Sequence, residues 1–372
     1  MLAARNMTVP TPPACPEEIR VDLGTRSYSV VVGGGVLPEV GDRLAALGHA
    51  GRCAIVTDET VAALYLEGLD ASLRAAGFDP VAITLPDGEQ HKTLASLALI
   101  FDQLLPSGID RHTVLVALGG GVIGDLTGFA AATLLRGLPV VQVPTTLLAQ
   151  VDAAIGGKTA VNHSTGKNLI GAFHQPSAVF ADVSTLRTLP DRELRAGLAE
   201  VVKYGVIGDA TLFGEIEQGA DALLARDPAV LTRVVVASCR QKAAVVEVDE
   251  REETGLRAVL NFGHTVGHGL EAVTGYRRYL HGEAVAIGMV AAARISQALG
   301  VCDGTVADRL IAVLGQLGLQ TTMPSELRTP ALAAAMQRDK KAVGGRIRFV
   351  GVEAVGRTRV IELEVSEILK HL

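Results

Sequence analysis

The sequence predicts an α/β domain, with a mostly parallel sheet and flanking helices, followed by a mainly α-helical domain. Short apolar runs alternate with helical patterns as far as about residue 190, which is typical of strands joined by covering helices. Beyond that point strand signals fade, and most segments have helical period with Gly or Pro breaks. A chain of 372 residues can also bury two cores. We therefore expect a loose leader at 1–16, an α/β domain at 17–190 and a helical domain at 191–372.

The elements of an alternating fold follow one another in the first part of the chain. Strands are predicted over 27–32, 53–57, 81–85, 113–118, 139–143 and 178–182, and helices over 38–47, 60–77, 93–105 and 126–135. In an open α/β sheet, ligands bind at the carboxyl ends of the strands. Asp58, directly after the second strand, is therefore a candidate for ligand contact.

Composition narrows the class of protein. Hydrophobic residues make up 48% of the chain and aromatic residues 3%, so the core must be aliphatic. The net charge of −6 provides no general attraction for nucleic acid or an acidic membrane, so local basic residues must bind any anionic ligand. No apolar run approaches the roughly 20 residues that span a bilayer, and the four cysteines are far apart, as in reduced thiols. We expect a cytoplasmic protein with no membrane or nucleic-acid partner.

A glycine-rich turn joins the strand at 113–118 to the next helix. Gly119, Gly121 and Gly124 satisfy the pattern G-x-G-x-x-G, which places backbone N–H groups and a helix N-terminus where a pyrophosphate could lie. The ordinary dinucleotide fold also needs an acidic residue about 20 positions further on, and the segment 140–143 contains none. The turn therefore favours a nucleotide-binding domain outside the usual dehydrogenases, with Asp125 as a candidate partner for the ribose or the nicotinamide.

The richest polar stretch of the first part runs from 143 to 171. It places Asp152, Lys158, Lys167 and Asn168 among glycines and apolar residues. Small residues let a backbone approach a phosphate, and lysines supply the charge. We interpret this stretch as a ligand site, with a solvated loop and two surface lysines as the alternative. The polar segment at 86–92 is, by itself, more often only a turn.

Candidate metal ligands occur in the second part of the chain. Glu200 lies among apolar residues, one helical turn before Lys203, and a carboxylate there is costly unless it is paired or bound to a metal. A simple Glu–Lys helix pair is the alternative. His264 and His268 have the i, i+4 spacing of a zinc pair, with Glu200 as a third ligand and an open position for substrate. From spacing alone, His281 would be spare.

Short motifs from both parts occur together and in order. They include Pro-Asp-Gly-Glu-Gln-His-Lys at 86–92, Gly-Gly-Gly-Val-Ile-Gly-Asp at 119–125, Gly-Lys-Asn-Leu-Ile-Gly at 166–171, Glu-Val-Val-Lys at 200–203, Asn-Phe-Gly-His at 261–264 and His-Gly-Glu-Ala-Val at 281–285. With these motifs the chain closely resembles the 3-dehydroquinate synthase family, a group of sugar-phosphate cyclases, from about residue 31 onward.

The resemblance implies the cofactors NAD and Zn²⁺, or Co²⁺ in place of zinc. It implies that Glu200, His264 and His281 bind the metal, in place of the set derived from spacing, and that His268 faces the substrate as a proton-transfer group. NAD contacts are implied for Asp58, Asp87, Gly88, Glu89, Gln90, His91, Lys92, Gly121, Val122, Ile123, Gly124, Asp125, Thr145, Thr146, Lys158, Lys167, Thr185, Leu186, Arg187 and Thr188.

The resemblance also implies a small sugar phosphate as substrate. Catalytic roles are implied for Asp152, Lys158, Lys203, Asn261 and His268, and substrate contacts for Arg136, Asn168, Lys242, Arg257 and Lys340. The family is commonly a homodimer, in which Arg136 would reach into the second subunit's site. The implied reaction converts 3-deoxy-D-arabino-heptulosonate 7-phosphate into 3-dehydroquinate and phosphate, with transient oxidation by NAD.

Three other functions remain open at this point. Another sugar-phosphate cyclase would use a substrate without the carboxylate, and the basic residues Lys242 and Arg257 argue against it. A metal-dependent polyol dehydrogenase of glycerol-dehydrogenase type would have no need of so many bases. A protein that senses NAD without catalysis would be favoured by a damaged metal triad, and the candidate ligands are all present.

Overall fold

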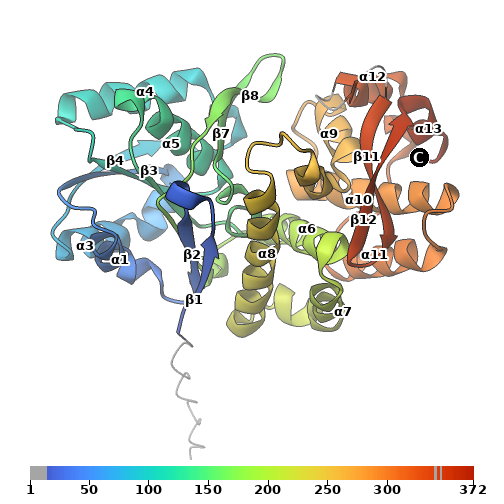
Figure 1. The fold of residues 1–372 in the computed structure, drawn as a ribbon, viewed down its shortest axis with the longest axis horizontal. Coiled ribbons are helices and arrows are strands. Elements are labelled where there is room, and N and C mark those ends of the chain that lie inside the picture. Colours follow the sequence, from blue (N-terminus) through green and yellow to red (C-terminus); the bar gives the residue numbers. More distant parts are fainter. Residues whose placement is uncertain (1–14, 339–341, 344–345) are drawn as a thin grey trace, which may run out of the picture.

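The computed structural model describes residues 15–338, 342–343 and 346–372 of the chain. Lys340, a predicted substrate contact, lies outside these residues. An α/β part and a largely helical part lie side by side, with α6 and α8 between them (Figure 1). In the described residues, no helix is long and apolar enough to cross a membrane.

A seven-stranded sheet organises the first part, in the order β1-β2-β9-β6-β5-β3-β4. All neighbours pair in parallel except β1 and β2. The strands are β1 (Glu17–Val21), β2 (Tyr28–Gly33), β3 (Arg52–Asp58), β4 (Asp79–Leu85), β5 (Val114–Gly119), β6 (Val140–Pro144) and β9 (Ala178–Asp182). The six predicted strands are confirmed, with shifted ends in most cases, whereas β1 was not predicted because its residues Glu-Glu-Ile-Arg-Val resemble an exposed polar segment.

Helices cover both faces of this sheet because alternate strand residues point to opposite sides. Cys53 and Ile55 pack with α1 (Val40–Ala46) and α3 (Glu67–Ala75). Ala54 and Val56 pack on the other face with α4 (Leu94–Leu104) and α5 (Gly121–Thr133). The helix predicted over 60–77 is divided into α2 (Glu59–Val61), the π-helical η3 (Ala62–Leu66) and α3.

The strand order reverses between β3 and β5. From β3 the chain moves outward to β4, and from β5 it moves the other way to β6. The crevice at such a switch point is the usual ligand site of an open α/β sheet. Here it lies between Asp58, at the end of β3, and the glycine-rich turn after β5. The helix predicted over 126–135 begins earlier, at Gly121, because the turn residues themselves form its first turn.

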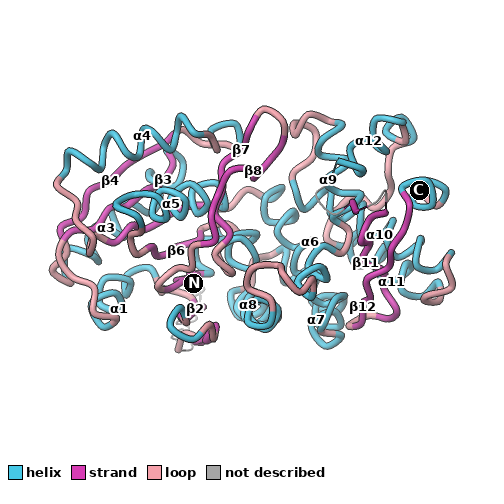
Figure 2. The backbone as a smooth tube through the Cα atoms, turned by 45° about the horizontal axis from the view of Figure 1, so that its top comes forward, coloured by secondary structure: helices cyan, strands magenta, loops and turns pink. Residues whose placement is uncertain are grey.

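The polar stretch after β6 forms a separate hairpin instead of a loop. Its strands are β7 (Lys158–His163) and β8 (Gly166–Phe173), which pair antiparallel. The hairpin packs on α5, where a Cβ on Gly128 would lie 2.3 Å from Thr159 Cγ2, so the close approach requires glycine. In the tilted view the hairpin lies between the parallel sheet and α9 (Figure 2).

Helices dominate the second part, as predicted. They are α6 (Asp191–Gly208), α7 (Ala210–Leu224), α8 (Pro228–Val248), α9 (His264–Val273), α10 (His281–Ala298), α11 (Gly304–Gln316), α12 (Pro330–Arg338) and α13 (Val365–Lys370). A small antiparallel sheet of β10 (Ala342–Val343), β11 (Arg346–Ala354) and β12 (Arg357–Glu364) was not predicted. The prediction of a mainly helical domain is confirmed, although its fading strand signals concealed this sheet.

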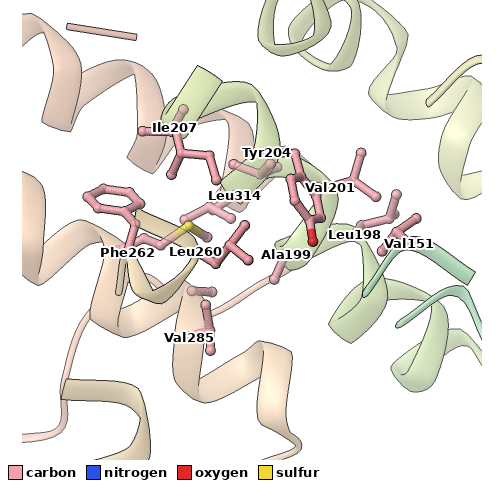
Figure 3. Close-up of a cluster of buried hydrophobic side chains, with 14 of the residues drawn as sticks. Val151, Leu198, Ala199, Val201, Tyr204, Ile207, Leu260, Phe262, Val285 and Leu314 are labelled. Carbon is pink, nitrogen blue, oxygen red and sulfur yellow. The ribbon is translucent and has the colours of Figure 1, made fainter. Parts of the chain in front are cut away.

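A continuous apolar core joins the two parts. It contains Val30 and Val179 of the parallel sheet together with α6, α8, α10 and α11. Side chains of α6 lie between Val151 of the first part and Phe262 and Val285 of the second (Figure 3). Helix α6 begins at Asp191, beside the predicted domain boundary, but the shared core means that the division at residue 190 stays a prediction.

Candidate functional site

Three histidines converge where α9 and α10 meet. His264 begins α9, His268 lies one turn later and His281 begins α10. Their ring centroids are 5.1 to 5.7 Å apart. The two helices can approach closely because Gly288 has no side chain, since a Cβ there would lie 2.0 Å from the Gly263 carbonyl oxygen.

Glu200 on α6 completes this cluster. Its side chain is fully buried, and its Oε1 lies 3.7 Å from His264 Nε2 and 3.6 Å from His281 Nε2. Neither carboxylate oxygen has a hydrogen-bond partner among the described residues, although Oε2 forms an ion pair with Lys203. Tetrahedral ligands at about 2.1 Å from a zinc ion lie about 3.4 Å from one another. A buried carboxylate whose Oε1 faces two imidazole nitrogens without a hydrogen bond therefore fits a divalent cation.

His268 is a competing ligand. One ligand atom from each of His264, His268 and His281 can be chosen so that all three lie within 4.8 Å of one another. The set with Glu200 is favoured, because its buried Oε1 has no hydrogen-bond partner among the described residues and lies within 3.7 Å of both His264 Nε2 and His281 Nε2. The assignment of Glu200, His264 and His281 as ligands stays a prediction.

A carboxylate that the sequence prediction left unassigned lies behind His281. Glu271 Oε2 lies 3.1 Å from His281 Nδ1, and its Oε1 accepts a hydrogen bond from Lys167 Nζ at 3.1 Å. Burial alone would raise the pKa of Glu271, but His281 and Lys167 outweigh it and lower the pKa to about 2. Glu271 could have been found in the sequence, since it follows His264 by seven residues and so lies on the same face of α9.

A second group of charges adjoins Glu200. Lys242 on α8 donates a hydrogen bond to Asp152 Oδ1 at 2.6 Å, and Lys203 Nζ lies 3.9 Å from the same oxygen. The hydroxyl of Tyr204 also donates to Asp152. Burial alone would raise the pKa of Asp152, but Lys242 and Lys203 hold it well below its usual range. Burial lowers the pKa of Lys242 to about 8.

The Asp152 carboxylate owes its position to an irregular turn. Residues Ala149–Ala153 form one turn of π-helix, η7, after β6. The buried Gln150 in this turn donates hydrogen bonds to the carbonyl oxygens of Pro144 and Asp182, which ties it to β6 and β9. The sequence offered no signal for the π-turn or for the Tyr204 contact, because both depend on how η7 packs against α6.

Lys158 and Arg257 form an outer basic pair. Lys158, at the start of β7, pairs with Glu252, whose Oε1 also lies 3.9 Å from Arg257 Nε. The Arg257 side chain is buried, and its Nη1 donates to the Glu250 carbonyl oxygen at 2.6 Å. Burial and the nearby Arg257 lower the pKa of Lys158. Both cations therefore lie beside the carboxylate of Glu252, in the loop before η9 (Leu256–Asn261).

The predicted nucleotide contacts surround the switch point. Asp58 caps α2 through a hydrogen bond from the Val61 N–H at 2.8 Å. Asp125 forms an ion pair with Lys92, which also donates to Asn168 Oδ1 at 2.6 Å. Asn168 has a φ of 54°, in the left-handed region that asparagine tolerates better than most residues. The segment at 86–92 is thus held by the hairpin and α5, and is more than an isolated turn.

The remaining predicted residues lie at the edges of this region. Thr145 and Thr146 follow β6, and the run from Thr185 to Thr188 lies at η8 (Val183–Arg187) after β9. The Thr145 hydroxyl is buried without a hydrogen-bond partner among the described residues. Asn261 ends η9, next to the histidine cluster in sequence. Arg136 is exposed, with a φ of 68°, and no contact with the other site residues is found in the described part of the chain.

Comparisons with known proteins identify relatives along nearly the whole chain. Family models described as 3-dehydroquinate synthase N-terminal and C-terminal match residues 82–196 and 197–342. A 3-dehydroquinate synthase from Geobacter metallireducens is 51% identical over 354 residues, which cover 95% of this chain and 98% of the relative. One from Pelobacter propionicus is 50% identical over 351 residues, which cover 94% of this chain and 97% of the relative.

Solved structures share the fold. A 2-epi-5-epi-valiolone synthase from Streptomyces hygroscopicus, described with NAD⁺ and Zn²⁺ bound, has a TM-score of 0.85 at 30% identity, covering 92% of this chain and 95% of that one. A protein from Sinorhizobium meliloti described as a probable glycerol dehydrogenase has a TM-score of 0.63 at 17% identity, covering 91% of this chain and 93% of that one. The second likeness concerns the fold alone.

Proposed function

Because the chain belongs to the 3-dehydroquinate synthase family, we propose that it converts 3-deoxy-D-arabino-heptulosonate 7-phosphate into 3-dehydroquinate and phosphate. One observation of the site carries the proposal. The candidate metal centre around Glu200 is joined, through Lys203, to the half-buried Asp152 and the buried Lys242. Such a site offers a Lewis acid beside cations that can bind a carboxylate and a phosphate.

The reaction sets a constraint on any redox cofactor. Substrate and product differ by one phosphoric acid, so the reaction involves no net oxidation or reduction. A hydride removed during the reaction must therefore be returned before the product leaves. The enzyme would be a phosphate-eliminating lyase, and we place it in the cytoplasm, in the biosynthesis of aromatic amino acids.

NAD and a divalent metal are the cofactors that we assign to this chain. The NAD⁺ and Zn²⁺ of the valiolone synthase support this assignment. Glu200, His264 and His281 would hold the metal, and the switch-point crevice between β3 and β5 would hold the nucleotide. When bound, NAD supplies reversible hydride transfer, and the metal polarises substrate oxygens as a Lewis acid.

The chain's own residues bind and orient the substrate. Lys242, with its pKa lowered to about 8, is still mostly protonated at neutral pH and can bind an anionic group. Lys158 and Arg257 supply two further cations on the outer side. His268 borders the metal cluster at a ring distance of 5.2 Å from His264, and it would move a proton at the substrate. Much of the catalysis would then be positioning and charge stabilisation.

The second subunit is a further part of the proposal. Arg136 is exposed and shows no contact with the other site residues in the described part of the chain. In a homodimer it would reach the partner's substrate. An Arg136→Ala variant should weaken substrate binding without changing metal content, and light scattering should give twice the 38.7 kDa mass of the chain.

A direct assay tests the function. Metal-loaded protein is incubated with the heptulosonate phosphate and a small amount of NAD, and phosphate and dehydroquinate are measured together. We expect equal amounts of both. A matched sugar phosphate that lacks the carboxylate should react poorly, because Lys242 and Arg257 would lose their anionic partner. If that analogue is converted and the heptulosonate is not, the chain has a different cyclase activity. If neither substrate reacts, the proposed function is wrong.

A further inference from the structure

Glu271 connects a candidate metal ligand to the β7–β8 hairpin. The Glu271 side chain is only 3% exposed. One of its oxygens lies 3.1 Å from His281 Nδ1, and the other accepts a hydrogen bond from Lys167 Nζ, also at 3.1 Å. Both oxygens are thus engaged, one by the start of α10 and one by β8.

The contact with Glu271 determines which nitrogen of His281 carries a proton. An ionised carboxylate can only accept hydrogen bonds. His281 Nδ1 must therefore donate, which leaves Nε2 with a free lone pair in the neutral ring. That nitrogen lies 3.6 Å from Glu200 Oε1, too far for a hydrogen bond, and the same oxygen lies 3.7 Å from His264 Nε2. The ring is therefore oriented as a metal ligand requires.

We propose that Glu271 is a positioning residue, which fixes the ring of His281 for the metal and ties that ring to the hairpin through Lys167. The inference rests on the metal site of the proposed function. Carboxylates that accept the second N–H of a ligating histidine are a general feature of metal sites, and their loss typically weakens metal binding 10- to 100-fold.

The hydrogen bond from Lys167 also connects Glu271 to the β7–β8 hairpin. Lys167 lies on β8, and its Nζ is also 3.7 Å from Glu89 Oε1 and 4.7 Å from the centre of the Tyr276 ring. Glu89 lies in the 86–92 segment beside the nucleotide crevice, whereas Tyr276 follows α9. Lys167 therefore links the crevice side of the first part to the metal side of the second. A displacement of Lys167 with the hairpin would therefore act on His281 through the side chain of Glu271.

The competing explanation is that Glu271 only neutralises Lys167. That role would need one oxygen, and it would not require the burial of the carboxylate against a histidine. The two explanations differ in a measurable way, because an ion pair that serves stability alone leaves metal affinity and the ligand field of the metal unchanged.

The test uses the whole protein, stripped of metal and titrated with Zn²⁺ against a competing chelator. Glu271→Gln should weaken zinc binding about 10- to 100-fold, and it should shift the visible absorption bands of the Co²⁺-loaded protein. Lys167→Met should weaken zinc binding by a smaller factor, because Glu271 keeps His281 but loses its own support. Glu217→Gln is the matched control, since it removes a carboxylate paired with Arg309 on other helices. It should bind zinc as the unmodified protein does.

The outcomes separate the two proposals. Unchanged zinc affinity and an unchanged cobalt spectrum in folded Glu271→Gln would overturn the positioning role alone, and the metal site would stand. If the unmodified protein takes up no zinc or cobalt, the metal site and the positioning role both fail. Circular dichroism and the melting temperature establish that each variant is folded. Should Glu271→Gln not fold, Lys167→Met decides, and equal affinity in that variant would count against the link.

Discussion

The candidate site gathers charged residues that lie buried or half-buried beside one another. Glu200, Lys203, Asp152 and Lys242 alternate in sign along a continuous set of contacts. Each charge is costly to bury alone and becomes tolerable beside the next. At one end of this row is Lys242, whose pKa is lowered to about 8. At the other end is Glu200, whose carboxylate oxygens have no hydrogen-bond partner among the described residues. A substrate anion and a divalent cation would complete the two ends.

Exchanging individual histidines tests the ligand assignment. His281→Ala should weaken metal binding by more than roughly a hundredfold. Loss of a residue that only hydrogen-bonds a metal ligand costs up to about that much, and loss of the ligand itself should cost more. His268→Ala should keep the metal within a few-fold and lose roughly 10²- to 10⁴-fold in rate, as expected for a proton-transfer group. Elemental analysis after dialysis and phosphate release measure the two effects. Full metal content in His281→Ala would show that His268, and not His281, is the second histidine ligand.

The pKa of Lys242 predicts how substrate binding depends on pH. A lysine with a pKa of about 8 is mostly protonated at pH 7 and mostly neutral at pH 9. Affinity for an unreactive phosphonate analogue of the substrate should therefore fall as the pH rises through about 8, by roughly tenfold between pH 7 and pH 9. The same titration of Lys242→Gln corrects for ionisation of the analogue itself. Parallel pH profiles of the two proteins would mean that Lys242 does not bind the anion.

Residue chemistry was predictable where the sequence shows an unusual combination. Glu200 was identified as a candidate because a carboxylate among Leu, Ala and Val is rare, and the structure buries it completely. Spacing alone favoured the pair His264 and His268. Sequence spacing cannot show that the turn before α10 brings His281 Nε2 to 3.6 Å from Glu200 Oε1. The family resemblance supplied that choice. Glu271 was overlooked because a glutamate on a helix is usually solvated.

At the scale of elements, the site depends on how closely α10 can approach α6 and α9. Gly282 follows His281, and a Cβ there would lie 1.9 Å from the Ala196 carbonyl oxygen on α6. No side chain fits in that gap. The glycine therefore sets the separation between the helix that carries His281 and the helix that carries Glu200.

Filling this gap gives an element-scale prediction. Gly282→Ala should push α10 away from α6, costing about 1–3 kcal/mol of unfolding free energy and weakening zinc binding. Urea unfolding and chelator competition measure the two effects. Gly214→Ala, on α7, is the control because no atom lies within 4 Å of its added Cβ. It should gain up to about 1 kcal/mol from better helix propensity. Unchanged stability and zinc affinity in Gly282→Ala would contradict this packing argument.

Elements were predictable where local pattern and burial agree. The buried strands of the parallel sheet were all found, because a run such as Val114–Gly119 is apolar throughout. The β7–β8 hairpin was not found, since its residues alternate lysine, asparagine and glycine with apolar residues and resemble a binding loop. Its strands exist because they pack on α5 at Gly128, a contact that sequence pattern cannot reveal. The sheet near the C-terminus was missed for a similar reason.

On the scale of the whole molecule, the site lies between two parts that share one core. Asp152 comes from the first part, whereas Glu200, Lys242 and the histidines come from the second. The continuous apolar cluster around α6 and α8 fixes the positions of these groups relative to one another. The lysines Lys158 and Lys167 lie on the β7–β8 hairpin of the first part. Neither part contains a complete site.

The most direct test of the cyclase function follows nicotinamide absorbance and phosphate release in one cuvette, with the heptulosonate phosphate in large excess over enzyme and NAD. Because substrate and products are at the same oxidation level, we predict that phosphate accumulates over many turnovers while NADH never exceeds the enzyme concentration. A small amount of NAD should then suffice for complete conversion. NADH that builds up in step with substrate loss, or a reaction that stops when NAD is used up, would contradict the cyclase function and favour a polyol dehydrogenase.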